Sequence, residues 1–553
     1  MTFNTLGFAA FFILFFVFYY AFGKKYKIQN LLLLFGSYFF YGSWDVRFLF
    51  LIILSSNFDY LFGLIIDKNR LTLSQRVKTA MFLLLSGVFF ILIQYKSVSL
   101  SFYPFSLVID SDSIIDPLGY KVLFFSAAGM ISLNLLYEIT RNWEEKRRRK
   151  LYVILSVVMN LSILGFFKYY NFFVDSFTDL LQAIFNYTAD TWTLKIILPV
   201  GISFYIFKSI SYTVDVYRKN MDSCAGLVDY SVYLAFFPQL LAGPIERAKN
   251  LISQLQHVRP PLTKDYIYEG VWLFTWGLYK KVAADNLAIV VNEIFGPYDI
   301  LQAPVTVPED GLRILIAVYA YTIQIYCDFS GYTDMARGIG RLLGFKTMLN
   351  FNLPYFSKTP QEFWRRWHIS LSTWLRDYLY ISLGGNRGGR GGLYLNLFLT
   401  MLLGGLWHGA AWTFVLWGAY HGILLVLYRI FDIGNDINER GVWGNFFHGF
   451  ITFNLVAYGW LMFRAKNMTT ITVFTLSIFT SPFPSPEALA SLFTVLKFTW
   501  FLALFQVIQF FLKDLEPVRR WNWFLQLNVW LFIIMSILSF TGSKVQEFIY
   551  FAF

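Results

Sequence analysis

Apolar runs about as long as a membrane-spanning helix recur along the whole chain, and this repetition constrains the fold more than any single motif. Examples are Leu6–Phe22, Phe48–Ile66, Lys121–Ile139, Leu151–Phe167 and Phe524–Phe540. About 20 residues of α-helix cross the roughly 30 Å hydrocarbon core of a bilayer, and lipid-exposed backbone must satisfy its own hydrogen bonds there. We therefore expect an all-α polytopic membrane protein with roughly 11–14 transmembrane helices and further interfacial or re-entrant helices around a central cavity.

The composition of the chain supports a membrane-embedded class. Hydrophobic residues make up 57% of the 553 residues and charged residues only 14%. The first run lacks the basic flank and the cleavage pattern of a secretory signal, so we expect it to remain as a span. Two cysteines, Cys224 and Cys327, are too few for a disulfide framework, and neither has a metal-binding spacing. The net charge of +12 fits basic cytoplasmic loops and gives no reason to expect nucleic acid.

Basic residues gather after alternate apolar runs, at 24–27, 68–78 and 141–150, whereas the loop Ser97–Asp116 is acidic. Because Lys and Arg favour cytoplasmic loops, this pattern predicts an extracytoplasmic N-terminus. Beyond residue 190 the runs shorten and prolines interrupt them, so we expect residues 191–430 to form a catalytic core around the cavity. N-terminal helices in 1–190 and C-terminal helices with an aromatic tail in 431–553 would flank it. The charged stretch Phe345–Gly392 is expected to form the interfacial or re-entrant helices.

His408 is the first candidate for chemistry, because it stands in the motif GGLWHGAAW inside a long apolar run. Histidine exchanges a proton near neutral pH, so a buried one could act as a general base. Gly405 and Gly409 are spaced for close helix packing, and Trp407 and Trp412 would line the surroundings of His408. A packing histidine bonded to a backbone carbonyl explains the same residues equally well.

His368 is the second candidate and lies in EFWRRWHISLSTWLRD. At helical spacing Trp364, Trp367, His368 and Leu371 share one face, which is typical of an amphipathic helix at the membrane surface. The functional alternative is that His368 faces the reaction cavity. Basic residues of this segment would then bind the phosphates of an acyl donor; the candidates are Arg365, Arg366 and Arg376.

Carboxylates close two other apolar runs. Asp328 and Asp334, in YCDFSGYTD, could orient a histidine, and Glu246 with Arg247 could form a local ion pair; all four could equally be helix-end and pairing residues. The loop GGNRGGRGG lacks the spacing of known phosphate-binding loops, so it is better explained as a flexible connection.

The ordered motifs LPVGISFYIFKSISYTVDVYR, LAGPIER, YCDFSGYTDMARGIGRLLGF, RWHISLS, LGGNR and LWHGAAW together resemble the membrane-bound O-acyltransferase family. The resemblance covers about Leu198 to Tyr420 and is strongest to the bacterial branch that acetylates exported polysaccharide or peptidoglycan. It implies His408 as the catalytic histidine and His368 as the second active-site position. From the residues themselves, Asp328 and Trp407 are candidates for supporting roles.

The last eight residues, QEFIYFAF, resemble a tail in which a tyrosine carries the acyl group, and this implies that Tyr550 is an acyl relay. An aromatic anchor at the membrane interface is the alternative. The resemblance also implies acetyl-CoA as co-substrate without a tightly bound cofactor or metal. It further implies an extracytoplasmic SGNH-type acetyltransferase as partner, a polysaccharide or peptidoglycan acceptor, and a bacterial inner-membrane location.

Three rival functions remain open on the sequence. Teichoic-acid D-alanyl transfer shares both histidine motifs. A secondary transporter of an anionic solute would use the same cavity, although no inverted repeat supports it. A scaffold for an export complex would leave the clustered histidines unexplained.

Overall fold

The computed structural model describes residues 1–23, 25–94, 98–102, 105–109, 115–186, 193–241, 243–299, 310–434, 441–541 and 548–549. Within these residues the chain is helical apart from one antiparallel hairpin, in which β1 (Val98–Phe102) pairs with β2 (Phe105–Ile109). The hairpin lies in the acidic loop between the fourth and fifth helices. The all-α class is therefore confirmed with this one addition.

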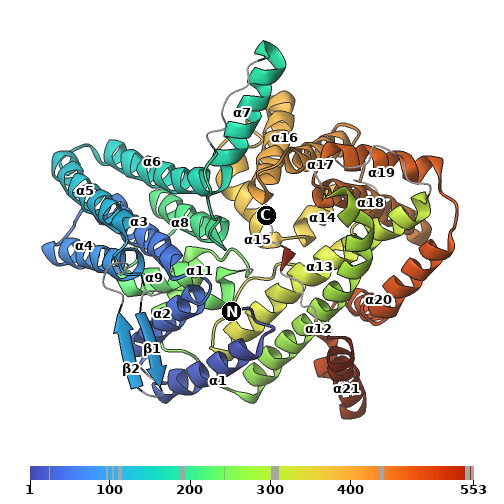
Figure 1. The fold of residues 1–553 in the computed structure, drawn as a ribbon, viewed down its shortest axis with the longest axis horizontal. Helices are drawn as coiled ribbons and strands as arrows, with labels where there is room; N and C mark the ends of the chain where they lie inside the picture. The colour runs from blue at the N-terminus through green and yellow to red at the C-terminus, as the bar shows by residue number, and fades with distance from the viewer. Residues whose placement is uncertain are drawn as a thin grey trace.

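The N-terminal third forms a helical bundle on the left of Figure 1, apart from its last helix, α7 (Tyr170–Phe185), which lies at the top beside α16 (Gly389–His408). Its elements are α1 (Leu6–Ala21), α2 (Tyr26–Gly42), the 3-10 turn η1 (Val46–Phe48), α3 (Leu49–Lys68), α4 (Leu73–Gly87), the π-helical turn η2 (Val88–Leu92), α5 (Pro117–Thr140), α6 (Glu145–Leu164), the π-helical turn η4 (Gly165–Tyr169) and α7 (Tyr170–Phe185).

The middle of the chain supplies short helices and two long ones. The elements are α8 (Ile202–Tyr217), α9 (Leu227–Ala235), α10 (Phe237–Leu240), α11 (Ala248–Leu255), α12 (Lys264–Phe295), η5 (Gly296–Tyr298), α13 (Gly311–Leu342), η6 (Pro354–Phe356), α14 (Pro360–Arg366), α15 (Ile369–Trp374), the π-helical turn η7 (Leu375–Tyr380) and α16 (Gly389–His408). The charged stretch after residue 345 thus forms short broken helices, as expected.

The C-terminal part packs on the other side of the long pair, on the right of Figure 1. It comprises α17 (Trp412–Ile430), α18 (Gly441–Arg464), α19 (Met468–Thr480), α20 (Pro486–Leu512), η9 (Pro517–Arg520) and α21 (Trp523–Phe540).

Nine helices of the described part are long and apolar enough to cross a membrane. Two shorter apolar helices, Leu6–Ala21 and Met468–Thr480, bring the number to the lower end of the expected range. Most of the apolar runs identified in the sequence lie within these spans. The run Leu151–Phe167, for example, lies within the longer span Glu145–Phe185. The helix α12 is not among them, although it is 32 residues long.

The pair α12–α13 crosses the molecule diagonally between the two groups of helices (Figure 1). Glycines bring the two backbones together: a Cβ on Gly277 would lie 2.4 Å from the carbonyl oxygen of Gly331, and one on Gly338 would lie 2.6 Å from that of Gly270. Two long helices that approach this closely form a rigid wall. The link between the short helices α14 and α15 lies against α13, where Trp367 and His368 contact Tyr326 and Phe329.

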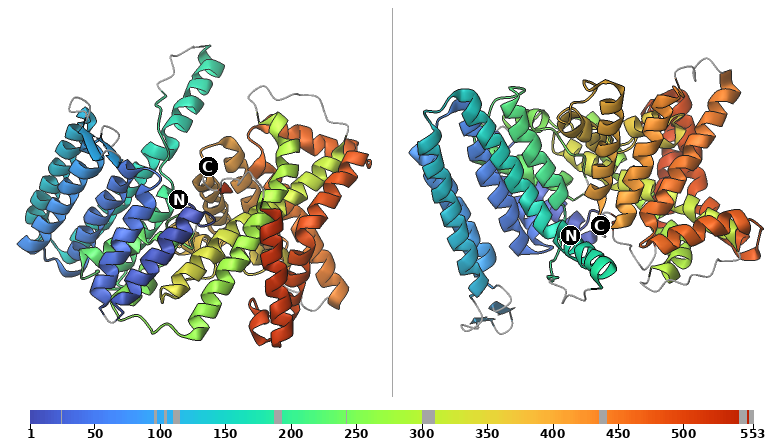
Figure 2. Two further views of the ribbon diagram at one scale, coloured as in Figure 1. Left: turned by 60° about the horizontal axis from the view of Figure 1, so that its bottom comes forward. Right: turned by 90° about the horizontal axis from the view of Figure 1, so that it is seen from above.

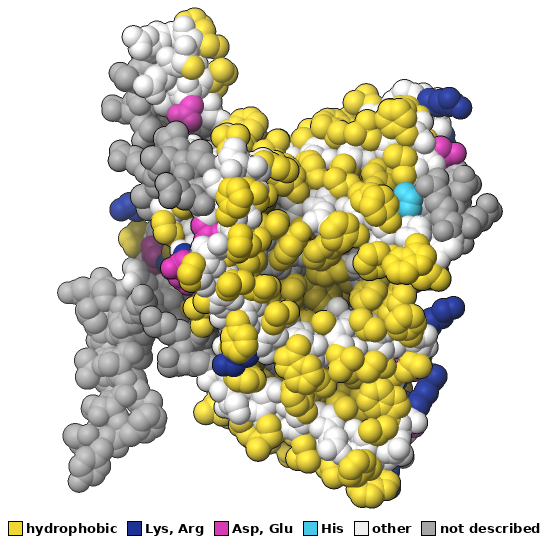
Figure 3. Space-filling model, turned by 90° about the vertical axis from the view of Figure 1, so that its right-hand side faces the viewer, with side chains coloured by type: hydrophobic (Ala, Val, Ile, Leu, Met, Phe, Trp, Pro, Cys, Tyr) yellow, Lys and Arg dark blue, Asp and Glu magenta, His cyan; other side chains and the backbone are white. Residues whose placement is uncertain are grey.

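The outer face around α20 carries hydrophobic side chains almost without interruption, and charged groups gather at its margins (Figure 3). Phe479, Phe493, Trp500 and Phe511 are each more than half exposed. Exposed apolar area on this scale is typical of a surface that faces lipid.

Candidate active site

His408 is the last residue of α16, and it is only 4% exposed. The end of α16 lies against α17, because a Cβ on Gly405 would sit 2.3 Å from the carbonyl oxygen of Phe414 and 2.8 Å from the Cα of Gly418. The predicted close approach is confirmed for Gly405. Gly409 lies one residue beyond the helix, where a Cβ would overlap the ring of Phe414.

Aromatic rings enclose the imidazole of His408. The ring centroids of Trp407 and Trp417 lie 5.1 Å and 5.0 Å away, both in edge-on geometry. Trp412 was also expected among the aromatic residues around His408. That prediction is wrong, because the side chain of Trp412 is 56% exposed and packs against Phe172. The first turn of α17 directs Trp412 outward, and Trp417 takes the inner position.

His368 is completely buried between α14 and α15. The prediction of one amphipathic helix through this segment is wrong: α14 ends at Arg366, and His368, with a φ of 42° in the left-handed region, precedes α15. Left-handed backbone is uncommon outside glycine, although histidine adopts it more often than most residues. The break turns the imidazole into the protein and away from the surface.

Asn350 holds this turn. Its backbone oxygen accepts from the N–H of Ile369 at 2.9 Å, and its side-chain oxygen accepts from the N–H and the Oγ of Ser370 at 3.2 and 2.9 Å. The Oγ of Ser370 accepts in turn from the N–H of Ile245. Two separate segments, around Asn350 and Ile245, therefore hold the backbone next to His368.

The two candidate histidines come together in the fold. Their ring centroids are 6.4 Å apart, and Trp407 lies 6.2 Å from His368 on the same side. Phe329 of α13 packs edge-on against His368 at 4.6 Å. This places the two imidazoles in one buried pocket lined by aromatic rings.

Two spaces flank His408. A pocket of about 40 Å³ is lined by Lys168, residues 198–204, Trp407 and His408. A cavity of about 710 Å³ begins at the turn of residues 409–411 and is lined further by Tyr321, Arg464 and Ile549. The turn after His408 therefore lies between the small pocket and the large cavity.

Asp328 contacts a lysine and the chain's tail. Its Oδ1 accepts from Lys281 at 2.8 Å, and its Oδ2 accepts from the N–H of Ile549 at 2.7 Å. Phe548 packs on Tyr332 with the ring centroids 4.3 Å apart. The recorded hydrogen bonds of Asp328 therefore anchor the tail, which differs from the predicted orientation of a histidine. Tyr550 follows Ile549 in the sequence but lies outside the described residues.

The three arginines predicted to hold the donor lie away from both spaces. Arg366 bonds to Glu362 at 2.8 Å within α14, Arg376 bonds to Asp377 at 2.7 Å, and Arg365 is exposed. Their role in donor binding stays a prediction.

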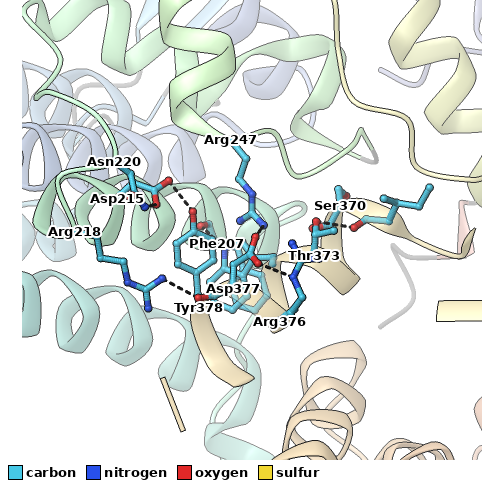
Figure 4. A network of polar contacts seen from close by, with 12 residues as sticks. Phe207, Asp215, Arg218, Asn220, Arg247, Ser370, Thr373, Arg376, Asp377 and Tyr378 are labelled. Atoms are coloured by element: carbon cyan, nitrogen blue, oxygen red, sulfur yellow. Dashed lines mark hydrogen bonds and ion pairs between the residues drawn. The ribbon is translucent and has the colours of Figure 1, made fainter. Parts of the chain in front are cut away.

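Asp377 is the centre of a larger cluster, drawn in Figure 4. Arg247 reaches its carboxylate at 3.0 Å, and Arg218 donates to its backbone oxygen at 2.8 Å. Of the two alternatives for Glu246 and Arg247, Arg247 follows the helix-end and pairing one: it precedes α11 and pairs with Asp377 of η7 rather than with Glu246. Glu246 accepts from the N–H of Met348.

Three residues next to the histidines were missed from the sequence. Asn350 and Trp417 stand beside or inside quoted motifs but carry no signal of their own, because polar loop residues and tryptophans are common in this chain. Lys168 did carry one: it is a lone cation within the long apolar segment that begins at Leu151. Its Nζ donates to the carbonyl oxygens of Trp407 and His408.

Residues 218–433 match the model of the membrane-bound O-acyltransferase family. This stretch contains His368, His408 and most of the turns that position them. It overlaps the predicted core of residues 191–430.

Named relatives extend the match. The chain is 48% identical over 324 residues to "Probable alginate O-acetylase AlgI" of Pseudomonas aeruginosa, covering 58% of this chain and 59% of that protein. It is 37% identical over 346 residues to "Peptidoglycan O-acetyltransferase" of Helicobacter pylori, covering 58% and 63%. A "Teichoic acid D-alanyltransferase" of Bacillus subtilis is 29% identical over 284 residues, covering 48% and 69%. The matches to the first two span less than two thirds of those proteins. Residues 218–433, which contain both candidate histidines, are therefore similar to the membrane-bound O-acyltransferase family and to the matching parts of these relatives.

Proposed function

We propose that this chain is a membrane O-acyltransferase that moves an acetyl group from a cytoplasmic thioester donor to a hydroxyl group. The observation that carries the proposal is the pairing of the buried His408 and His368, whose ring centroids are 6.4 Å apart; His408 lines the small pocket, and the turn that follows it lines the large cavity. Similarity to relatives named for O-acetylation supports acetyl as the group.

The chemistry follows from the positions of the two imidazoles. His408 removes the proton from the attacking hydroxyl, whose oxygen then bonds to the thioester carbonyl carbon. The carbon–sulfur bond breaks, and the thiolate leaves and takes up the proton. His368 orients the donor carbonyl and stabilises the charge that develops on its oxygen. Acetyl-CoA is the proposed donor, and Arg365, Arg366 and Arg376 are the proposed contacts for its phosphates.

Tyr550 is the proposed first acceptor. Ile549 lines the large cavity beside residues 409–411, and its N–H is bonded to Asp328. Tyr550 is the next residue in the sequence. A phenolic ester is more reactive than an alkyl ester, so acetyl could pass on to a second enzyme. We propose an SGNH-type acetyltransferase outside the inner membrane as that enzyme and an exported polysaccharide or peptidoglycan as the final acceptor.

Replacement of the catalytic base tests the proposal. His408→Ala is expected to lower O-acetylation of the envelope polymer by about 100-fold or more, because general-base catalysis contributes at least that factor. The measurement is the ester content of polymer from cells that carry wild-type or variant protein at equal membrane levels. His257→Ala is the matched control, since His257 is exposed and its ring bonds to the backbone oxygen of Ser253 within the same segment. Undiminished acetylation in the His408 variant would reject the assignment.

The mass of the missing ester separates the two acyl groups. D-alanyl transfer is the alternative, in line with the more distant teichoic-acid relative. If the His408→Ala strain lacks a D-alanyl ester instead of an acetyl ester, the transferred group is D-alanyl. Solute uptake by reconstituted liposomes without any acyl transfer would favour the transporter instead.

A further inference from the structure

The end of helix α16 is closed by side chains from a distant part of the chain. The last four carbonyl groups of an α-helix have no partner within the helix. In α16 the hydroxyl of Tyr169 donates to the oxygen of Leu406 at 3.0 Å, and the Nζ of Lys168 donates to those of Trp407 at 2.7 Å and His408 at 3.0 Å. Three of the four terminal acceptors are thus bound by two consecutive residues.

Lys168 and Tyr169 stand in η4, a π-helical turn between α6 and α7. Such turns are rare and are frequent at functional sites, because the extra residue redirects side chains. Figure 1 shows α7 next to α16 at the top of the molecule, and Figure 2 shows it projecting away from the neighbouring helices. Phe172, near the start of α7, contacts Trp412 at the start of α17, so α7 also touches the helix that follows α16.

A lysine inside a membrane-spanning segment is energetically unfavourable. The span Glu145–Phe185 has the hydropathy of a membrane helix, and a cation at membrane depth is retained where it serves a purpose. No ion pair with a carboxylate is recorded for Lys168 in the described part of the chain; its recorded hydrogen bonds are with the negative end of the α16 dipole. The ammonium also lies 5.8 Å from the ring centroid of Trp407.

Lys168 also shares a space with the catalytic candidate. Both Lys168 and His408 line the 40 Å³ pocket. A helix end without such a clamp frays, and fraying by a fraction of a turn would move the imidazole of His408 relative to His368. Displacement of a reacting group by about 1 Å is enough to cost roughly 100-fold in rate.

We propose that Lys168 is the positioning residue for His408: its ammonium clamps the last carbonyls of α16 and so fixes the imidazole against His368. The kinetic part of this inference rests on the proposed acyl transfer. The structural part does not.

Lys168→Met removes the ammonium and keeps most of the side-chain volume. The purified variant, reconstituted in liposomes, is expected to release thiol from acetyl-CoA about 100-fold more slowly, with the KM for acetyl-CoA changed little. Hydrogen–deuterium exchange of amides 404–408 should become faster. Lys168→Arg keeps a cation and is expected to recover most of both properties, and Tyr169→Phe, which removes one bond, should fall between the variant and the wild type.

The control is Lys497→Met, the same change on the exposed face of α20. It should alter neither property. Unchanged exchange at 404–408 in a monodisperse Lys168→Met protein would overturn the proposal, whatever the rate. If the wild type releases no thiol at all, the proposed acyl transfer fails, but the exchange comparison still decides whether Lys168 clamps α16.

Discussion

At the scale of single residues, the side chain of Asn350 is expected to govern the turn that carries His368. Asn350→Ala removes the acceptor for the N–H and the Oγ of Ser370, both of which are buried. A buried donor that loses its partner costs about 1–3 kcal/mol, so we expect the free energy of unfolding to fall by that amount. Tryptophan fluorescence during thermal unfolding in detergent measures it, and the acyl-transfer rate should fall as the turn loosens.

Asn350→Asp keeps an oxygen at the accepting position and should be milder than the alanine variant. Asn528→Ala is the control, since Asn528 is exposed on α21. Equal stability of the wild type and Asn350→Ala would show that other contacts hold the turn.

The identity of the two histidines could be predicted from the sequence, but their surroundings could not. Residue type and motif selected His408 and His368. The spacing of apolar residues around His368 then predicted a continuous helix, because periodicity carries no information about a left-handed residue inside the pattern. Asp328 stood in a quoted motif too, yet its partners Lys281 and Ile549 lie far away along the chain, so the sequence could not identify them.

At the scale of helices, the contact between α16 and α17 should be intolerant of one methyl group. Gly405→Ala would place a Cβ 2.3 Å from a backbone oxygen and 2.8 Å from the Cα of Gly418. Backbone atoms cannot rotate away, so the helices must separate and His408 must shift. We expect a loss of about 1–3 kcal/mol in the free energy of unfolding and a lower transfer rate, measured as above.

The same helix supplies a matched control. A Cβ on Gly391 would meet nothing within 4 Å. Gly391→Ala should therefore be neutral or stabilise the protein by up to about 1 kcal/mol through helix propensity. Similar behaviour of the two variants would mean that the close contact does not set the position of His408.

Helix packing could be predicted only where small residues marked it. Gly405 signalled the approach of α17, but Gly409 fell outside the helix because α16 ends at His408. The clamp from η4 was not predictable, because nothing local to residues 165–169 indicates which helix end they reach.

At the scale of the whole molecule, the membrane class and most spans followed from apolar length alone, whereas the arrangement of the spans did not. Apolar runs resemble one another, so their order in the sequence does not say which of them pack together. For this reason the sequence of the N-terminal helices indicated membrane spans but gave them no specific role. In the structure they carry Lys168 to the site and are joined by polar contacts across more than 90 residues of chain, such as that between Asp59 and Ser156.

Asp59 is expected to hold that N-terminal bundle together. It is completely buried in α3 and accepts hydrogen bonds from Ser156 at 2.6 Å and Asn160 at 2.9 Å on α6, and from Ser209 at 2.6 Å on α8. Asp59→Leu leaves three buried donors to find new acceptors, so the free energy of unfolding should fall by about 2–4 kcal/mol. Asp59→Asn keeps one acceptor and should cost less.

The exposed Asp179 of α7 is the control, and Asp179→Leu should change little. Because α6 continues through η4 into α7, loosening at Asp59 should also speed amide exchange at 404–408; stability loss without that change would mean that α6 and the clamp move independently.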